Sequence, residues 1–332
     1  MLNFTVNKND AGMRMDKLLV RLMPTLPRSM MYKLIRHKDI KVNGKRTAID
    51  YKPVAGDVIT AYVSDEFAAK KEPEFDFLNA SDNLDIVYED ENILLADKNQ
   101  GLLVHPDKNE YCDTLISRIC KYLYNKGEYD PLDENSFSPS LANRIDRNTG
   151  GIVIAAKNSQ SLKILCEKIK LRETDKRYLA VLHGTLNQKQ GLLEGYLEKN
   201  ENKNKVYLSQ KKSENNKIIK TGYKILAEKD GLSLAEVKLI TGRTHQIRAH
   251  FACIGHPLLG DGKYGKLKDD KKIGFNKQAL YSYKLTFDFK TDAGILNYLK
   301  GKTFTVKNVW FVNKLFPDQV KNIFTDSSEN IQ

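Results

Sequence analysis

Apolar positions in the first 40 residues follow a helical period. Between Met15 and Leu22 they recur at the i, i+3, i+4, i+7 spacing of an amphipathic helix, which Pro24 and Pro27 end. A second helix is predicted to begin with Ser29 as its N-cap. This helix is expected to turn three side chains inward: Tyr32, Leu34 and Ile35.

Short strands and tight turns follow these two helices. Residues 40–42 are predicted to form a strand and Asn43-Gly44 a turn. Gly56-Asp57 marks another turn, and residues 58–63 fit a closing strand. We therefore expect residues 1–63 to form a small α/β domain.

The pattern changes after residue 63. Residues 64–82 are rich in charge and have no apolar period, so they are the expected linker. Helices are predicted at 159–171 and 245–254. Strand-like runs are more numerous: 93–96, 102–104, 151–156, 177–182, 223–227, 233–239 and 280–287. Many strands with few helices indicate the α+β class, with a mixed, mainly antiparallel sheet and flanking helices and loops.

Domain limits follow from this pattern. We expect the α+β domain to span residues 83–318 and residues 319–332 to form a flexible tail. Residues 198–220, which are rich in Asn, Lys and Glu, are expected to form a solvated hairpin or loop.

Charge is unevenly distributed along the chain. Residues 1–63 hold seven Lys and five Arg against five Asp and no Glu, which accounts for +7 of the total net charge of +12. An excess of cations favours a polyanionic partner, because each neutralised phosphate releases a condensed counterion. A soluble protein with a lysine-rich surface is the plainer interpretation of the same composition.

Four cysteines and six histidines suggest neither a disulfide framework nor a metal site. Cys112, Cys120, Cys166 and Cys253 form no C-x-x-C pair. His245 and His250 lie five residues apart without a carboxylate on their helix, so we expect no metal. With no apolar span and no secretory signal at the start, cytoplasmic residence without a membrane partner is the default expectation.

The polar segment 143–151 precedes an apolar strand and places one carboxylate between two arginines. Asp146 lies between Arg144 and Arg147 in a loop that leads to residues 152–156. A positioned nucleophilic carboxylate would need such surroundings. A turn in which the aspartate caps the following residues, with both arginines in solvent, explains the spacing equally well.

Two resemblances bear on these alternatives. The N-terminal helices with their basic face, followed by Val42-Asn43-Gly44-Lys45 and Gly56-Asp57, resemble the S-four-type RNA-binding domain. That resemblance implies that five basic residues contact RNA phosphates: Arg28, Lys33, Arg36, Lys41 and Lys45. Solvated helix faces remain the alternative.

The segment 143–151 resembles the R-L-D-x-x-T-S-G motif of the RluA-type pseudouridine synthase family, whose aspartate is catalytic. Residues 176–181 resemble the family strand whose tyrosine, here Tyr178, stacks on the target base. Residues 242–265 match the longest family signature, and its first arginine, Arg243, corresponds to the basic partner of the aspartate. The resemblance implies that Asp146 is the nucleophile. Without the resemblance, Tyr178 would be interpreted as a buried tyrosine in the core.

Other polar side chains of the same segments are expected to bind substrate. They are Asn143, Arg144, Arg147, Thr149, Gln246, Arg248 and His250. Gln246 and His250, one helical turn apart, are also expected to brace the loop by hydrogen bonds. The chain departs from the family pattern at Asn143, where His is usual, and at Gly150, where Ser is usual.

The resemblance implies isomerisation of uridine to pseudouridine in structured RNA, without cofactor or metal, by a monomer. Large-subunit ribosomal RNA is the expected target and tRNA the alternative. A catalytically silent RNA-binding or ribosome-assembly factor is a rival from another class, against which the joint presence of Asp146, Tyr178 and Arg243 argues. A metal-dependent nuclease would need an acidic cluster that the sequence does not offer.

Overall fold

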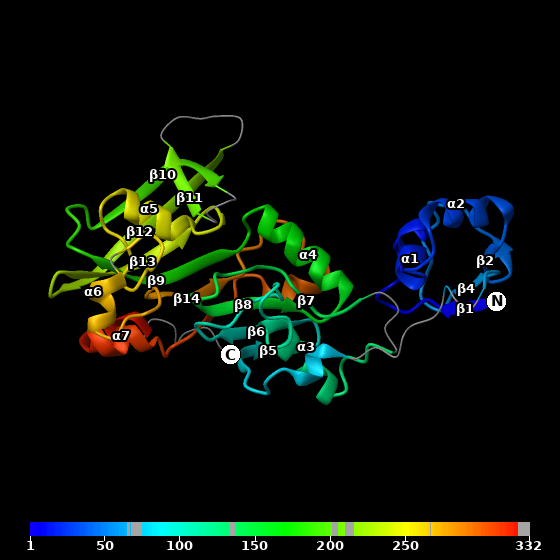
Figure 1. Cartoon of the computed structure of the whole chain (residues 1–332), viewed down its shortest axis with the longest axis horizontal. Helices are drawn as coiled ribbons and strands as arrows, with labels where there is room; N and C mark the ends of the chain where they lie inside the picture. Colours follow the sequence, from blue (N-terminus) through cyan, green and yellow to red (C-terminus); the bar gives the residue numbers. More distant parts are fainter. Residues whose placement is uncertain are drawn as a thin grey trace.

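The computed structural model describes residues 1–64, 67, 75–132, 137–200, 205–209, 216–265 and 267–324. Two bodies are visible, a small N-terminal one and a larger one built on a long sheet (Figure 1). They meet at Ser159, whose backbone N–H donates to Asn9 Oδ1 at 3.0 Å and whose hydroxyl donates to the Asn9 carbonyl at 3.0 Å.

The N-terminal body packs two helices on a four-stranded sheet; the sequence predicts both helices and two of the strands, but not the strands at 2–5 and 45–46. Its strands run in the order β1 (Leu2–Thr5), β4 (Val58–Ala61), β2 (Ile40–Val42) and β3 (Lys45–Arg46), and its helices are α1 (Met15–Leu22) and α2 (Arg28–His37). The apolar face of α1 is buried from Met15 to Leu22. The prediction for α2 was wrong in two details: Pro27 is the N-cap, and Tyr32 is exposed while Met31 is buried.

The larger body contains an 11-stranded sheet. In chain order its strands are β5 (Asp85–Glu89), β6 (Ile93–Lys98), β7 (Ser140–Leu141), β8 (Gly150–Ala156), β9 (Asp175–His183), β10 (Gln190–Asn200), β11 (Lys205–Ser209), β12 (Lys217–Lys229), β13 (Leu232–Leu239), β14 (Leu280–Thr286) and β15 (Thr303–Thr305). The main path runs β11-β10-β12-β13-β9-β14-β8-β6-β5, and only β14 and β8 pair in parallel. The expected α+β class with a mainly antiparallel sheet is confirmed.

Helices cover this sheet and its ends. They are η2 (Asp76–Asn79), α3 (Leu115–Asn125), α4 (Ser159–Lys170), α5 (Gln246–Cys253), α6 (Leu267–Lys272), η3 (Gly294–Leu299), α7 (Trp310–Leu315), η4 (Pro317–Gln319) and α8 (Val320–Phe324). Strand β8 is buried along its whole length, as expected of a central strand with both faces covered. Among the described residues, no helix is long and apolar enough to cross a membrane.

Several sequence-based boundaries need correction. Residues 65, 66 and 68–74 of the predicted linker 64–82 lie outside the described residues, but 76–79 form η2, whose Phe77 ring packs on Tyr124 of α3. Residues 102–104 form no regular strand, and Leu103 makes one isolated bridge to Thr114. The tail expected from residue 319 is helical at 320–324, where Phe324 is buried against Tyr283; residues 325–332 lie outside the described part.

Candidate active site

Asp146 lies in the loop between β7 and β8, and that loop is held by backbone hydrogen bonds. Its carbonyl accepts from Thr149 N–H at 3.0 Å, which closes a tight turn, and the Arg147 carbonyl accepts from Gly101 N–H at 2.8 Å. The Asp146 side chain is 24% exposed. Its carboxylate is therefore in a fixed position, partly open to solvent.

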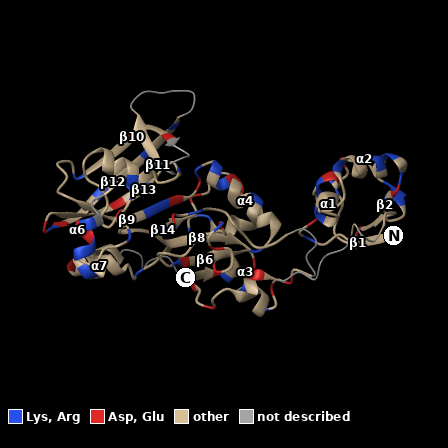
Figure 2. Ribbon diagram, viewed as in Figure 1, with Lys and Arg blue, Asp and Glu red and all other residues tan. Residues whose placement is uncertain are grey.

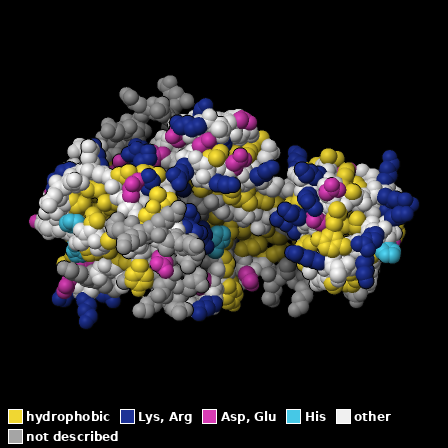
Figure 3. Space-filling view, turned by 90° about the horizontal axis from the view of Figure 1, so that it is seen from above, with side chains coloured by type: hydrophobic (Ala, Val, Ile, Leu, Met, Phe, Trp, Pro, Cys, Tyr) yellow, Lys and Arg dark blue, Asp and Glu magenta, His cyan; other side chains and the backbone are white. Residues whose placement is uncertain are grey.

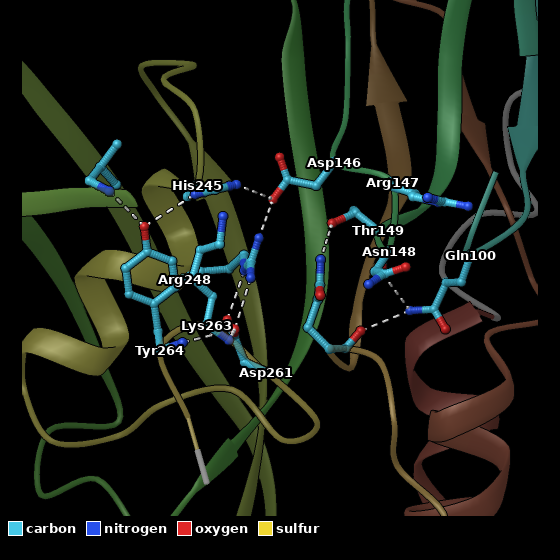
Figure 4. A network of polar contacts seen from close by, with 12 residues as sticks. Gln100, Asp146, Arg147, Asn148, Thr149, His245, Arg248, Asp261, Lys263 and Tyr264 are labelled. Carbon is cyan, nitrogen blue, oxygen red and sulfur yellow. Dashed lines mark hydrogen bonds and ion pairs between the residues drawn. The ribbon is translucent and has the colours of Figure 1, made fainter. Parts of the chain in front are cut away.

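Arg248 of α5 binds this carboxylate. Its Nη1 donates to Asp146 Oδ2 at 2.8 Å, across 102 positions of sequence. Its Nε and Nη2 donate to the two carboxylate oxygens of Asp261 at 2.7 and 2.8 Å. Because a bidentate pair fixes the plane of a guanidinium, Asp261 aims the remaining Arg248 donor at Asp146 (Figure 4).

Asp261 is buried, and the surrounding groups keep it charged. Besides Arg248, the backbone N–H groups of Lys263 and Tyr264 donate to Asp261 Oδ1 at 2.8 and 3.1 Å. Burial opposes the charge, but the hydrogen bonds and the Arg248 cation outweigh it, so the pKa of Asp261 is lowered. The pKa of Arg248 is raised against its own burial by both carboxylates, so the two groups form a charged pair.

His245 lies on the same side of Asp146 and is held by Tyr264. The Tyr264 hydroxyl accepts from Val206 N–H at 2.9 Å and lies 3.1 Å from His245 Nδ1. The other ring nitrogen of His245, Nε2, lies 3.8 Å from Asp146 Oδ2. Burial, reinforced by the Arg248 charge, lowers the His245 pKa, so a neutral ring faces the carboxylate at pH 7.

Tyr178 forms the buried wall of this region. It pairs with Ser282 of β14, which pairs with Gly151 of β8, so Tyr178 lies in line with the start of β8, where the Asp146 loop ends. The ring is 5% exposed and packs in an apolar cluster. Burial, with a smaller effect of the Asp146 charge, raises the Tyr178 pKa to about 12. The Tyr178 hydroxyl is therefore protonated at neutral pH.

Lys98, a buried lysine that the sequence analysis did not identify as a site residue, holds the Asp146 loop in place. Lys98 Nζ donates to the carbonyls of Asn99, Leu102 and Arg147 at 3.0, 2.8 and 2.9 Å. It thereby ties the end of β6 to the residue after Asp146. Burial lowers the Lys98 pKa to about 7, although the Asp146 charge opposes that shift. A lysine two positions after the apolar run 93–96 was the available sequence signal.

Gln100 supports the same loop from the other side. Its Nε2 donates to the carbonyls of Asn148 and Gln278 at 3.1 and 2.8 Å. Its Oε1 accepts from Trp310 Nε1 at 3.0 Å, which connects α7 to Gln100. Elements from four distant parts of the chain thus hold the loop in place.

Arg243, the predicted partner of Asp146, does not fill that role. Its side chain is exposed and, within the described part of the chain, makes no hydrogen bond or ion pair. The partner is Arg248, five residues further along the same signature. The pairing was assigned to the wrong arginine, because Arg243 precedes α5 whereas Arg248 lies on the buried face of that helix.

Four predicted substrate contacts instead bind the protein itself. Asn143 Oδ1 accepts from Ile154 N–H at 2.8 Å, and buried Thr149 accepts from Gln278 Nε2 at 3.2 Å. Gln246 accepts from Arg243 N–H at 3.1 Å and donates to Thr221 Oγ1 at 2.9 Å. His250 Nδ1 lies 2.7 Å from Thr221 Oγ1. Gln246 and His250 therefore hold α5 against β12 by hydrogen bonds rather than bracing the Asp146 loop as predicted, and neither is open to a substrate.

Arg144 and Arg147 remain accessible. Both are exposed. Arg147 Nε donates to the Gly101 carbonyl at 2.9 Å, and its side chain points away from the pair formed by Asp146 and Arg248 (Figure 4). Burial, with a smaller effect of the Arg144 charge, lowers the His105 pKa, so the Arg144 cation acts on His105.

Gly150 has a structural reason for replacing the usual serine. A Cβ added there would lie 2.4 Å from Cε2 of Tyr281, so the tyrosine ring occupies that space. The Tyr281 hydroxyl donates to Asp97 Oδ1 at 2.6 Å, which fixes the ring. The Tyr281 ring therefore fits in this position because residue 150 has no side chain.

The predicted RNA-contacting cations lie on the surface of the N-terminal body. Arg28, Lys33 and Arg36 are exposed on α2, and Lys45 is exposed on β3. Lys41 lies 4.9 Å from the ring centroid of Tyr62. Within the described ranges none of the five pairs with a carboxylate. Figure 2 marks basic residues along the ribbon of this body, and Figure 3 shows basic side chains on the face in view. No group of three or more His, Cys, Asp or Glu among the described residues could hold a metal ion.

Comparison with known proteins decides the family. Residues 92–253 match the family model of RNA pseudouridylate synthase, and residues 13–59 match that of the S4 domain. A relative from Mycoplasma capricolum described as an uncharacterized RNA pseudouridine synthase is 35% identical over 314 residues, which cover 93% of this chain and 99% of that protein. The chain belongs to the RNA pseudouridine synthases. Both predicted resemblances, to the RluA-type family and to the S-four-type domain, are confirmed.

Other relatives of this synthase carry more specific names. Ribosomal large subunit pseudouridine synthase D of Borreliella burgdorferi is 32% identical over 86% of this chain and 84% of that protein. Ribosomal large subunit pseudouridine synthase C of Haemophilus ducreyi is 29% identical over 86% and 87%. The solved structure of human RNA pseudouridylate synthase domain containing 4 shares the fold, with a TM-score of 0.53, 20% identity and coverage of 68% of this chain and 89% of that one.

Proposed function

We propose that this synthase isomerises specific uridines of large-subunit ribosomal RNA through a covalent intermediate on Asp146. The observation that carries the proposal is the aimed ion pair: buried Asp261 holds Arg248, and Arg248 holds the Asp146 carboxylate in a partly open loop. A purely structural aspartate would not need a partner that a second carboxylate orients. Support for the ribosomal target comes from the names of two relatives.

The reaction exchanges one bond of the nucleoside for another. The bond from C1′ of ribose to N1 of uracil breaks, a bond from C1′ to C5 forms, C5 loses its proton and N1 gains one. Uridine and pseudouridine are isomers, so the exchange needs neither redox change nor external energy. A carboxylate that attacks the ribose or the ring divides this exchange into two easier steps.

The side chains around Asp146 suit such a step. Negative charge develops on the departing uracil, and fixed donors stabilise it best when they need not reorganise. Arg248 orients the carboxylate, the neutral ring of His245 lies beside it, and Tyr178 forms the wall against which the base packs. Extrusion of the uridine costs a few kcal/mol, and stacking on an aromatic ring returns about 1 to 3 kcal/mol.

A comparison of pseudouridine maps tests the target. Total RNA from cells with and without the gene should differ at one or a few uridines of large-subunit ribosomal RNA, and expression of the intact gene should restore them. Loss confined to tRNA would support the tRNA-directed alternative and contradict this target. Unchanged maps in all RNA classes would support the catalytically silent binding factor.

A further inference from the structure

A cavity lies on the side of the Asp146 loop that is opposite Arg248. It has a volume of about 430 Å³ and is lined by residues from the loop around Gly101, the turn at Glu110, the start of α3 and Arg147. Figure 4 shows Arg147 and Gln100, which both line it, on the side of the loop opposite Arg248 and Asp261. The volume falls in the range of small-ligand sites and accommodates a nucleobase.

One face of this cavity carries free hydrogen-bond donors. Arg147 uses Nε to bind the Gly101 carbonyl at 2.9 Å, and within the described ranges its two Nη nitrogens have no hydrogen-bond partner. The backbone N–H groups of Asn109 and Glu110, with a smaller effect of the Arg147 charge, lower the pKa of Asp107, which starts the turn that ends at Glu110. The guanidinium is thus anchored through Nε and presents two parallel donors.

Another face carries a free acceptor. Glu110 Oε1 accepts from the backbone N–H groups of Cys112 and Asp113 at 3.1 and 2.9 Å. Its other oxygen, Oε2, accepts no hydrogen bond from the described residues. Two backbone donors therefore hold this carboxylate in place and leave one oxygen for a ligand.

The remaining charged groups of the cavity satisfy each other. Arg118 donates to both oxygens of Asp113 at 2.7 Å, and its Nη1 donates to the Asn83 carbonyl at 2.6 Å. With this pair neutralised, the free groups are a fork of donors and one acidic oxygen. A phosphate would be repelled by the carboxylates, whereas a base with acceptors on one edge and N–H donors on another matches both groups.

We propose that this cavity binds the base of a nucleotide close to the target uridine and selects guanine there. Arg147 would donate to O6 and N7 of guanine, and Glu110 Oε2 would accept from the N–H groups of its Watson–Crick edge. Adenine offers no N–H at ring position 1, and the pyrimidines lack N7. Unstacked bases of single-stranded RNA are read at such edges. The inference rests on the proposed function, because it needs the RNA strand to pass over the Asp146 loop.

A pool of RNA hairpins tests this selection. Each hairpin carries one loop uridine with three randomised nucleotides on either side, and pseudouridine is mapped by sequencing after incubation with the full-length protein. Wild type should modify hairpins with guanine at one fixed flanking position about tenfold faster than the others. Glu110→Gln, which turns the free acceptor into a donor, and Arg147→Lys, which removes the fork, should each abolish that preference.

Lys108→Gln is the matched control, because Lys108 is exposed in the same turn and does not line the cavity. It should leave the guanine preference unchanged even if it slows the reaction on every sequence. Modification without guanine preference at any flanking position, or a preference that survives in both cavity variants, would overturn this inference alone. A pool without pseudouridine would remove the proposed function and the inference together.

A second measurement isolates the contact to Glu110. Inosine, which lacks the 2-amino group of guanine, is placed at the preferred position of one modified hairpin. Wild type should lose about tenfold in kcat/KM on this substitution, whereas Glu110→Gln should respond little. Equal losses in both proteins would show that Glu110 does not read the base.

Discussion

At the residue scale, Asp146 is the last of three charged groups that bind one another in order: Asp261, Arg248 and Asp146. Backbone donors and Arg248 keep buried Asp261 ionised, and Asp261 in turn fixes the plane of the guanidinium that binds Asp146. Removing the arginine would leave Asp261 as an uncompensated buried charge, which typically costs 3 to 5 kcal/mol. Arg248 therefore supports both the fold and the orientation of the Asp146 carboxylate.

Arg248→Gln should lower the free energy of unfolding by about 3 kcal/mol or more and reduce kcat by at least about a hundredfold. Arg243→Gln is the matched control, because Arg243 is exposed and should change stability by less than about 0.5 kcal/mol. Denaturant titrations and single-turnover rates measure both quantities. Greater damage to turnover by Arg243→Gln than by Arg248→Gln would restore the pairing expected from the sequence.

His250 should make stability depend on pH. Burial lowers its pKa to about 4, whereas the unfolded chain has the ordinary value of 6.5. Between these values the unfolded state binds a proton that the folded state does not, so His250 lowers stability as pH falls from 6.5 to 4 and adds no further loss below 4. Its contribution reaches up to about 3 kcal/mol.

Urea titrations from pH 7.5 to 3.5 check this contribution. Relative to wild type, His250→Gln should lose less stability between pH 6.5 and 4, and an amide can keep the hydrogen bond to Thr221. The two proteins should run parallel above pH 7. Identical slopes throughout the acid range would show that His250 titrates normally in the folded protein.

The sequence allowed the loop of Asp146 and the wall residue Tyr178 to be predicted, but not the charged network. Asp146 and Arg248 are 102 positions apart, and no local pattern shows which of two arginines near α5 meets the carboxylate. The burial of Thr149 and Gln246 could not be predicted either, because a polar residue in a polar segment gives no sign of facing the interior. Their contacts depend on tertiary packing.

At the element scale, the parallel contact between β14 and β8 explains a departure from the family motif. Tyr281 lies opposite Gly150, and its ring fills the space that a side chain at Gly150 would need. The ring is fixed by its hydrogen bond to Asp97. The start of β8, directly after the Asp146 loop, is therefore closely packed.

Gly150→Ala should destabilise the protein by about 1 to 3 kcal/mol and lower turnover, because the added Cβ must displace either the ring or the loop. Gly222→Ala is the control within a strand, since the nearest atom to its added Cβ lies at an ordinary 3.5 Å. Thermal unfolding and initial rates measure the effects. If the two substitutions were equally harmless, the close packing at Gly150 would be disproved.

Elements with strong apolar runs were predicted well, and those with mixed patterns were missed. Strands β6, β8, β13 and β14 are buried and lie close to their predicted limits. The partly exposed strand β5 and the long hairpin strand β10 escaped notice because their apolar residues are diluted by polar ones. Helix α3 was missed although Thr114 caps it and Leu115, Ile119 and Leu123 repeat at its period.

At the scale of the whole molecule, we expect the basic N-terminal body to bind RNA and the sheet that carries Asp146 to hold the reaction site. Arg28, Lys33 and Arg36 of α2 are exposed and pair with no carboxylate of the described residues, and we expect them to contact RNA phosphates. Such contacts position a nucleic acid without reading its sequence, and each one steepens the salt dependence of binding. The body should therefore contribute affinity more than chemistry.

Replacing Arg28, Lys33 and Arg36 together by Gln should reduce the slope of log K against log salt by about 2 to 3. Turnover of RNA already bound should stay nearly unchanged. The control replaces three lysines of α6, at the opposite end of the molecule in Figure 1: Lys268, Lys271 and Lys272. Equal slopes for wild type and the α2 variant, measured by filter binding, would count against RNA binding by this face.

The most direct test of the account is the turnover of Asp146→Asn on its RNA substrate. The substitution changes one side-chain oxygen and keeps the shape of the loop, so RNA affinity should stay within about twofold of wild type. Pseudouridine formation under single-turnover conditions should be undetectable, because the amide cannot act as the nucleophile. Pseudouridine formed by this variant at the wild-type rate would contradict the assignment of Asp146.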